Sequence, residues 1–299
     1  MVLFFLNDFL IPGIVIGSIY ALGAIGVSLL FGNLRFANFG HGALMTAGAY
    51  VSLELFRATG LPILAVLPLS MVLTGLLGVA IDRVCLRPFR AEPAIISLIA
   101  SIGIALMLRS AIQLVFGVDL QSFSQGGIQL PLRFFDGALR VQEKHLWIVG
   151  TALVLMLATH LLLTRTKTGK AMRAMADSPE LARLSGIDTE RVIWATWMIS
   201  GGLAAAAGTL LGMDTQVTPT MGFHVLLPVF AAAILGGIGQ PYGAMAGGLV
   251  IGIAQEMVAF PWIGGVPLIS PSYKEGVAFA LMVLILIVRP SGIFRGRVF

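Results

Sequence analysis

The stretch ANFGHGALMTAGAY, residues 37–50, places an asparagine and a histidine at the start of an otherwise apolar segment that runs to Leu53. The rest of the chain has the same character, because 58% of its 299 residues are hydrophobic and only 11% are charged. A soluble globular chain carries roughly a quarter charged residues. The composition, with a mean hydropathy of +0.96, therefore indicates an all-α fold, a polytopic transmembrane helical bundle.

A helix needs about 20 apolar residues to cross the hydrocarbon core of a bilayer. The candidate segments are residues 9–31, 37–56, 61–81, 94–117, 145–163, 192–212, 226–238, 244–260 and 277–289. The seventh is short, and the turn-rich sequence GGIGQPYGA, residues 236–244, joins it to the eighth. These two segments are either full crossings or a re-entrant pair. We therefore expect about 8–9 membrane segments in one domain that covers residues 1–299.

Small residues recur four positions apart in several of these segments. Gly13 and Gly17 form such a pair in the first segment, and Gly248 and Gly252 form another in the eighth. This spacing lets helix backbones approach closely, and ordinary packing within the bundle is its expected role.

Lysine and arginine gather in three places, namely the loops 82–93 and 164–191 and the C-terminal tail. All three fall on one side of the membrane, which the positive-inside rule assigns to the cytoplasm. The loops 118–144, 213–225 and 261–276 and the N-terminus then lie outside. Within the first outer loop, LRFFDGALRV, residues 132–141, predicts a hairpin around Asp136 and Gly137.

The sequence lacks the motifs of several enzyme classes. It contains no H-E-x-x-H, no G-x-S-x-G and no P-loop. The single cysteine, Cys85, excludes an internal disulfide and a cysteine-built zinc site, and the four histidines are scattered. The net charge of +5 is explained by the basic loops. We therefore expect no catalytic residue, no metal site, no cofactor of this chain's own and no nucleic-acid partner.

The loop 164–191 is far more polar than its surroundings and has the signals of a short helix. Ser178 can cap this helix, Pro179 occupies its first position, and Glu180 lies in its first turn. Gly186 is placed to end it. A cap and a stop together are more than a loop requires, so they favour a docking element over a merely solvated loop.

The segment ELARLSG, residues 180–186, is similar to the E-A-A-x-x-x-G coupling loop of permeases in bacterial ABC importers. The wider chain resembles the smaller membrane subunit of high-affinity branched-chain amino acid importers. The matching stretches are residues 17–32, 37–50, 169–192, 200–212 and 231–255. Two positions depart from the family pattern, since Leu181 replaces an alanine and Gly40 replaces the alanine of N-F-A-H-G.

The resemblance implies a set of partners in a bacterial inner membrane. These are a second permease subunit, of the same or a larger related type, two ATP-binding cassette subunits and a periplasmic binding protein. It also implies that Glu180, Leu181, Ala182, Leu184 and Gly186 couple the permease to the ATPase. Related importers serve branched-chain or other amino acids, urea, short amides or aromatic acids. A secondary transporter acting alone is the competing class, and it has no need for the capped loop.

Four polar residues in the apolar segments are candidates for the translocation pathway. Asn38 can cap the second segment by accepting from the amide of Gly40 or the next residue, and His41 either packs against another helix or lines the pathway. Gln255 and Glu256 either meet a polar substrate or anchor a helix end at the outer interface. We expect Arg109 to extend toward the outer face, as long basic side chains do near a membrane surface.

Overall fold

We describe the fold from a computed structural model, in which the described residues are 6–90, 92–123, 132–134, 139–259, 270, 273–289 and 291–294. Each candidate segment coincides with a helix of the structure, which confirms the helical bundle. The helices are α2 (Ile11–Leu34), α3 (Gly40–Thr59), α4 (Ile63–Ile81), α5 (Ala94–Phe116), α6 (Glu143–Arg165), α9 (Thr189–Asp214), α10 (Met221–Gly236), α11 (Pro241–Ala259) and α12 (Lys274–Val288).

Shorter elements join and flank these helices. They are the π-helical turns η1 (Leu6–Leu10) and η2 (Asp82–Leu86), the 3-10 turn η3 (Arg87–Phe89), the helices α7 (Lys167–Asp177) and α8 (Pro179–Leu184), and the strands β1 (Leu132–Phe134) and β2 (Leu139–Val141). The two strands pair antiparallel, with Leu132 opposite Val141. The turn predicted at Asp136 and Gly137 lies outside the described residues.

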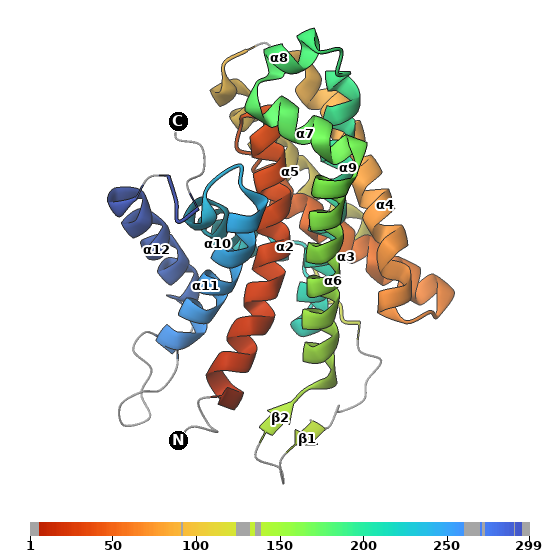
Figure 1. The fold of residues 1–299 in the computed structure, drawn as a ribbon. Coiled ribbons are helices and arrows are strands. Elements are labelled where there is room, and N and C mark those ends of the chain that lie inside the picture. The colour runs from red at the N-terminus through yellow and green to blue at the C-terminus, as the bar shows by residue number, and fades with distance from the viewer. Residues whose placement is uncertain are drawn as a thin grey trace.

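The bundle has two ends, which hold different loops. At one end, Arg90 donates to Glu190 at 2.8 Å, which joins the loop after α4 to the start of α9. We call this end, which also carries α7 and α8, the basic face. At the opposite face, Gln121 and Val217 form a bridge between the loops that follow α5 and α9. In Figure 1 the start of α2 and the strands β1 and β2 lie at the end opposite α7 and α8, as the sequence predicts.

Among the described residues, five helices are long and apolar enough to cross a membrane, namely α2, α4 with the turns after it, α5, α6 and α9. The shorter α10 has 16 residues, which makes it about 24 Å long. The turn between α10 and α11 nevertheless reaches the basic face, because Gly239 and Gln240 line a cavity of about 180 Å³ together with Arg173 of α7. Both helices thus extend between the two faces, which favours two crossings over a re-entrant pair.

The core of the bundle is built on close contacts between helix backbones. α2 packs along α11, where a Cβ atom at Gly17 would lie 2.9 Å from the Cα of Leu249. α9 packs along α3 in the same way, and a Cβ atom at Gly48 would lie 2.5 Å from that of Ala205. Glycine is required at both positions because any side chain would separate the helices. α2 and α9 are largely enclosed as a result, whereas α4, α5 and α6 present most of their surface outward.

Candidate functional site

The helix α8 has well-formed ends. The hydroxyl of Ser178 accepts from the amide of Leu181 at 3.4 Å, which confirms the predicted cap. At the other end Gly186 has φ +79°, and its amide donates to the carbonyl of Arg183 at 3.0 Å. The amide of Ile187 donates to the carbonyl of Ala182 at 3.0 Å. This pair of bonds is a Schellman motif, so the glycine stop is confirmed as well.

One face of α8 points away from the protein and is apolar. Leu181 is 64% exposed and Leu184 is 84% exposed, and their spacing of three positions puts both on the same side of the helix. Glu180 is exposed beside them. Ala182 is buried at 3% exposure, so its methyl group packs against the protein's own body and does not face the surface. The exposed pair of leucines lies at the basic face, where the neighbouring loops are polar.

Contacts on both sides of α8 along the chain connect it to the long helices α6 and α9. Thr166 separates α6 from α7, and its hydroxyl accepts from the amide of Gly169 at 3.0 Å. Met172 and Met175 bury α7 in the core. Near the end of α8, the guanidinium of Arg183 donates to the hydroxyl of Thr189, the first residue of α9, at 3.4 Å. The Thr166 cap was not predicted from the sequence, although a threonine directly before a helix is a recognisable N-cap signal.

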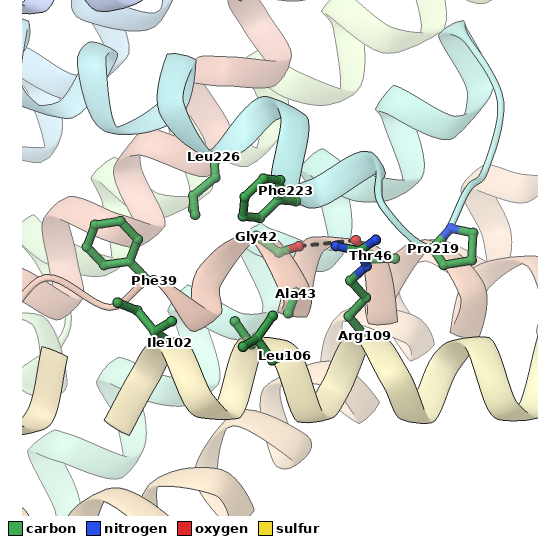
Figure 2. A pocket seen from close by; sticks show the side chains of 11 residues that line it. Phe39, Gly42, Ala43, Thr46, Ile102, Leu106, Arg109, Pro219, Phe223 and Leu226 are labelled. Carbon is green, nitrogen blue, oxygen red and sulfur yellow. Dashed lines mark hydrogen bonds between the residues drawn. The ribbon is translucent and has the colours of Figure 1, made fainter. Parts of the chain in front are cut away.

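A second candidate site is a groove between α3, α5 and α10, with a cavity of about 60 Å³. Figure 2 shows its walls, which are mainly apolar and include Phe39, Leu106, Phe223 and Leu226. Ile102 and Leu106 on α5 and Phe223 on α10 are 40%, 55% and 63% exposed, so the groove is open on one side. This site was not predicted from the sequence, since its walls come from three helices, and α5 and α10 are distant from α3 in the chain.

Backbone contact between α3 and α10 forms the closed side of this groove. The amide of Gly222 donates to the hydroxyl of Thr46 at 3.0 Å, and this hydroxyl donates to the carbonyl of Gly42 at 3.3 Å. The ring of Phe39 stacks on that of Phe230, with centroids 5.1 Å apart. α5 does not join this tight contact, and the space between α5 and the other two helices is the cavity.

Arg109 is the charged residue among those that line the cavity. Figure 2 shows its side chain pointing from α5 toward Thr46 on α3, across the groove. The expectation that Arg109 extends along the helix to the outer face is therefore wrong. The reason is local, because the cavity between α3 and α5 leaves open space for the guanidinium beside its own helix.

Asn38 and His41 are not among the residues that line the groove. The side-chain oxygen of Asn38 accepts from the amide of Gly40 at 3.0 Å, so the predicted interaction at the helix start is confirmed. His41 is fully buried against α2, where a Cβ atom at Gly26 would lie 2.6 Å from its Cε1 atom. Among the described residues, neither ring nitrogen of His41 has a hydrogen-bond partner. The structure thus places His41 against α2 and Asn38 at the start of α3, and neither lines the groove.

Gln255 and Glu256 hold the start of α12 and do not approach the groove. The side-chain amide of Gln255 donates to the carbonyl of Lys274 at 2.9 Å. The carboxylate of Glu256 pairs with the ammonium group of the same lysine at 2.7 Å. Of the two interpretations of this pair, anchoring of a helix end is the one that these contacts favour.

Comparisons with known proteins identify the family of this chain. Residues 9–286 match the family described as the permease component of branched-chain amino acid transport systems. The chain is 36% identical to the high-affinity branched-chain amino acid transport system permease protein LivH of Escherichia coli (strain K12), over 97% of this chain and 96% of that protein. It is 34% identical to BraD of Pseudomonas aeruginosa, over 95% and 94%.

A solved structure shares the fold. The complex of PsaBC from Streptococcus pneumoniae with a Fab contains a chain that superposes with a TM-score of 0.51 at 14% sequence identity. The superposition covers 96% of this chain and 92% of the other. At this identity the likeness concerns the fold alone.

Proposed function

We propose that this chain, which belongs to the branched-chain amino acid transport system permease family, is the membrane subunit of an ATP-driven importer that carries a branched-chain or related amino acid. The observation that carries this proposal is the exposed apolar face of α8. Leu181 and Leu184 on a capped helix at the basic face form a surface that a soluble partner can cover. The permeases LivH and BraD, which span nearly the same length, bear names of branched-chain amino acid transport.

The assembly we propose has the basic face in the cytoplasm of a bacterium and the protein in its inner membrane. The positive-inside rule gives this orientation. Two ATP-binding cassette subunits dock below, a second permease subunit, identical or related, lies alongside, and a periplasmic binding protein delivers the substrate from the opposite face. In this assembly the chain itself is not an enzyme and holds no cofactor, because the partner subunits hydrolyse ATP.

Within α8 we assign two kinds of role. Glu180, Leu181 and Leu184 are exposed and would touch the ATPase. Ala182 and Gly186 would act through the helix, the first by packing it against the body and the second by ending it. Because α7 and α8 are fixed between α6 and α9, a movement of the ATPase would pass to these two long helices, of which α9 packs along α3.

The test replaces both exposed leucines of α8. In proteoliposomes that hold the assembled transporter, we expect Leu181→Ala combined with Leu184→Ala to lower the ATP hydrolysis stimulated by the loaded binding protein at least fivefold. Alanine keeps the helix but removes the apolar surface. Leu114→Ala is the matched control, since Leu114 is 87% exposed on α5, away from the basic face, and should leave hydrolysis unchanged. Full stimulation in the double variant would contradict the docking role.

The substrate is identified on the partner that selects it. Isothermal titration of the cognate binding protein with leucine, isoleucine and valine should show binding. Binding of urea, a short amide or an aromatic acid in their place would assign this importer to another substrate within the same family.

A further inference from the structure

We propose that Arg109 binds the carboxylate of the transported molecule as it passes through the groove between α3, α5 and α10. This inference rests on the proposed function for the identity of the cargo, and on the structure for the site. An ionisable residue within a membrane helix faces the bundle interior or a watery cavity, because burial in lipid is costly. Arg109 lies on a cavity wall, as this rule requires.

The guanidinium of Arg109 is available for a ligand. No ion pair or hydrogen bond joins it to another described residue. The nearest polar group on the facing wall, the hydroxyl of Thr46, already donates to one backbone carbonyl and accepts from one amide. The lining thus leaves one cationic group with free donors, which matches a carboxylate, since arginine binds the two oxygens of such a group with parallel N–H bonds.

The direction of the Arg109 side chain argues against a contact with lipid headgroups. Arg109 lies seven positions before Phe116, the last residue of α5, which is about 10 Å along the helix axis. Its side chain points across the groove toward Thr46 and not along that axis (Figure 2). The charge is therefore directed at the space where a solute would pass.

The rest of the groove suits the apolar part of an aliphatic amino acid. Leu106, Phe223 and Leu226 form walls beside the arginine. A water molecule occupies about 30 Å³ in the liquid, so the cavity of about 60 Å³ admits a carboxylate group in this conformation. Among the residues that line the cavity there is no aspartate or glutamate for an ammonium group, so the amino group of the cargo faces the open side.

The first test measures the charge preference of the groove directly. Ala105 lines the cavity one helical turn before Arg109. In a Cys85→Ala background of the assembled transporter, Ala105→Cys should react several-fold faster with anionic methanethiosulfonate ethylsulfonate than with its cationic trimethylammonium counterpart. Adding Arg109→Gln should abolish this preference. Val118→Cys, an exposed site beyond α5, is the control and should show no effect of Arg109→Gln. An unchanged preference at position 105 would overturn the proposal.

The second test measures transport of radiolabelled leucine into proteoliposomes. We expect Arg109→Gln to assemble normally and to lower uptake at least tenfold, and Arg109→Lys to restore part of it, because lysine keeps the charge but loses the paired donors. Normal uptake by Arg109→Gln would show an interfacial anchor, and failure of the complex to assemble would show a contact with the second permease subunit. Both results overturn the proposal. If the unmodified transporter itself fails to take up leucine, the proposed function fails, while the thiol assay still decides the role of Arg109.

Discussion

Replacing Gly186 with valine should abolish the coupling between α8 and ATP hydrolysis without unfolding the protein. Gly186 has φ +79°, and a Cβ atom added there would have no neighbour within 4 Å. The free-energy cost of the substitution thus comes from the backbone conformation alone. The left-handed conformation costs a residue other than glycine roughly 1–3 kcal/mol. For valine we expect a cost in the middle of this range, about 2 kcal/mol, which lowers the ratio of intact to disrupted helix stop roughly 30-fold.

The assay is ATP hydrolysis by the assembled transporter in proteoliposomes, with and without the loaded binding protein. We expect Gly186→Val to insert at normal yield and to lose most of the stimulated hydrolysis. Gly186→Asn should keep most of it, because asparagine tolerates the left-handed region. Gly150→Val is the matched control, since a side chain at Gly150 also meets nothing within 4 Å but has ordinary helical backbone in α6. Normal stimulation in Gly186→Val, or an equal loss in Gly150→Val, would refute the reasoning.

Three further results are expected from the fold. In a cysteine-free background, single cysteines at Ser178 and Val118 should react with an impermeant maleimide from opposite sides of the membrane, and labelling of both from one side would contradict the arrangement of the two faces. Lys274→Met leaves the mostly buried Glu256 unpaired and should lower stability by about 2 kcal/mol, seen as a lower melting temperature; an unchanged value would show that the pair is dispensable. Gly248→Val places side-chain atoms in the backbone of α2 and should abolish monodisperse protein on size exclusion, whereas a normal yield would disprove the close contact.

Local signals in the sequence were sufficient for the helices and for α8. The membrane segments follow from apolar length, and the ends of α8 follow from Ser178 and Gly186, whose effects act within a few residues. Local signals also identified Asn38 correctly as a residue that bonds the start of α3. In each of these cases the interacting groups lie within one or two helical turns, so residues that are close in the sequence are also close in space.

The groove could not be predicted in this way. The groove residues Thr46, Arg109 and Phe223 come together only because three helices pack against one another. The sequence pattern of a single helix does not predict which other helices it contacts. The direction of Arg109 depends on a space that α3 and α10 leave, so rules for single side chains near a membrane surface gave the wrong orientation. Glu256 was ambiguous for the same reason, because its partner Lys274 lies beyond the loop to the next helix.

The contact between α3 and α10 also limits how this protein can be redesigned. A Cβ atom added at Gly222 would collide with the carbonyl oxygen of Gly42, so at these two positions the closed side of the groove admits no side chain. The opposite wall is different, since Ile102 and Leu106 on α5 are exposed and meet no such constraint. Mutant libraries that seek a new cargo should therefore vary the α5 wall and leave the α3–α10 contact untouched.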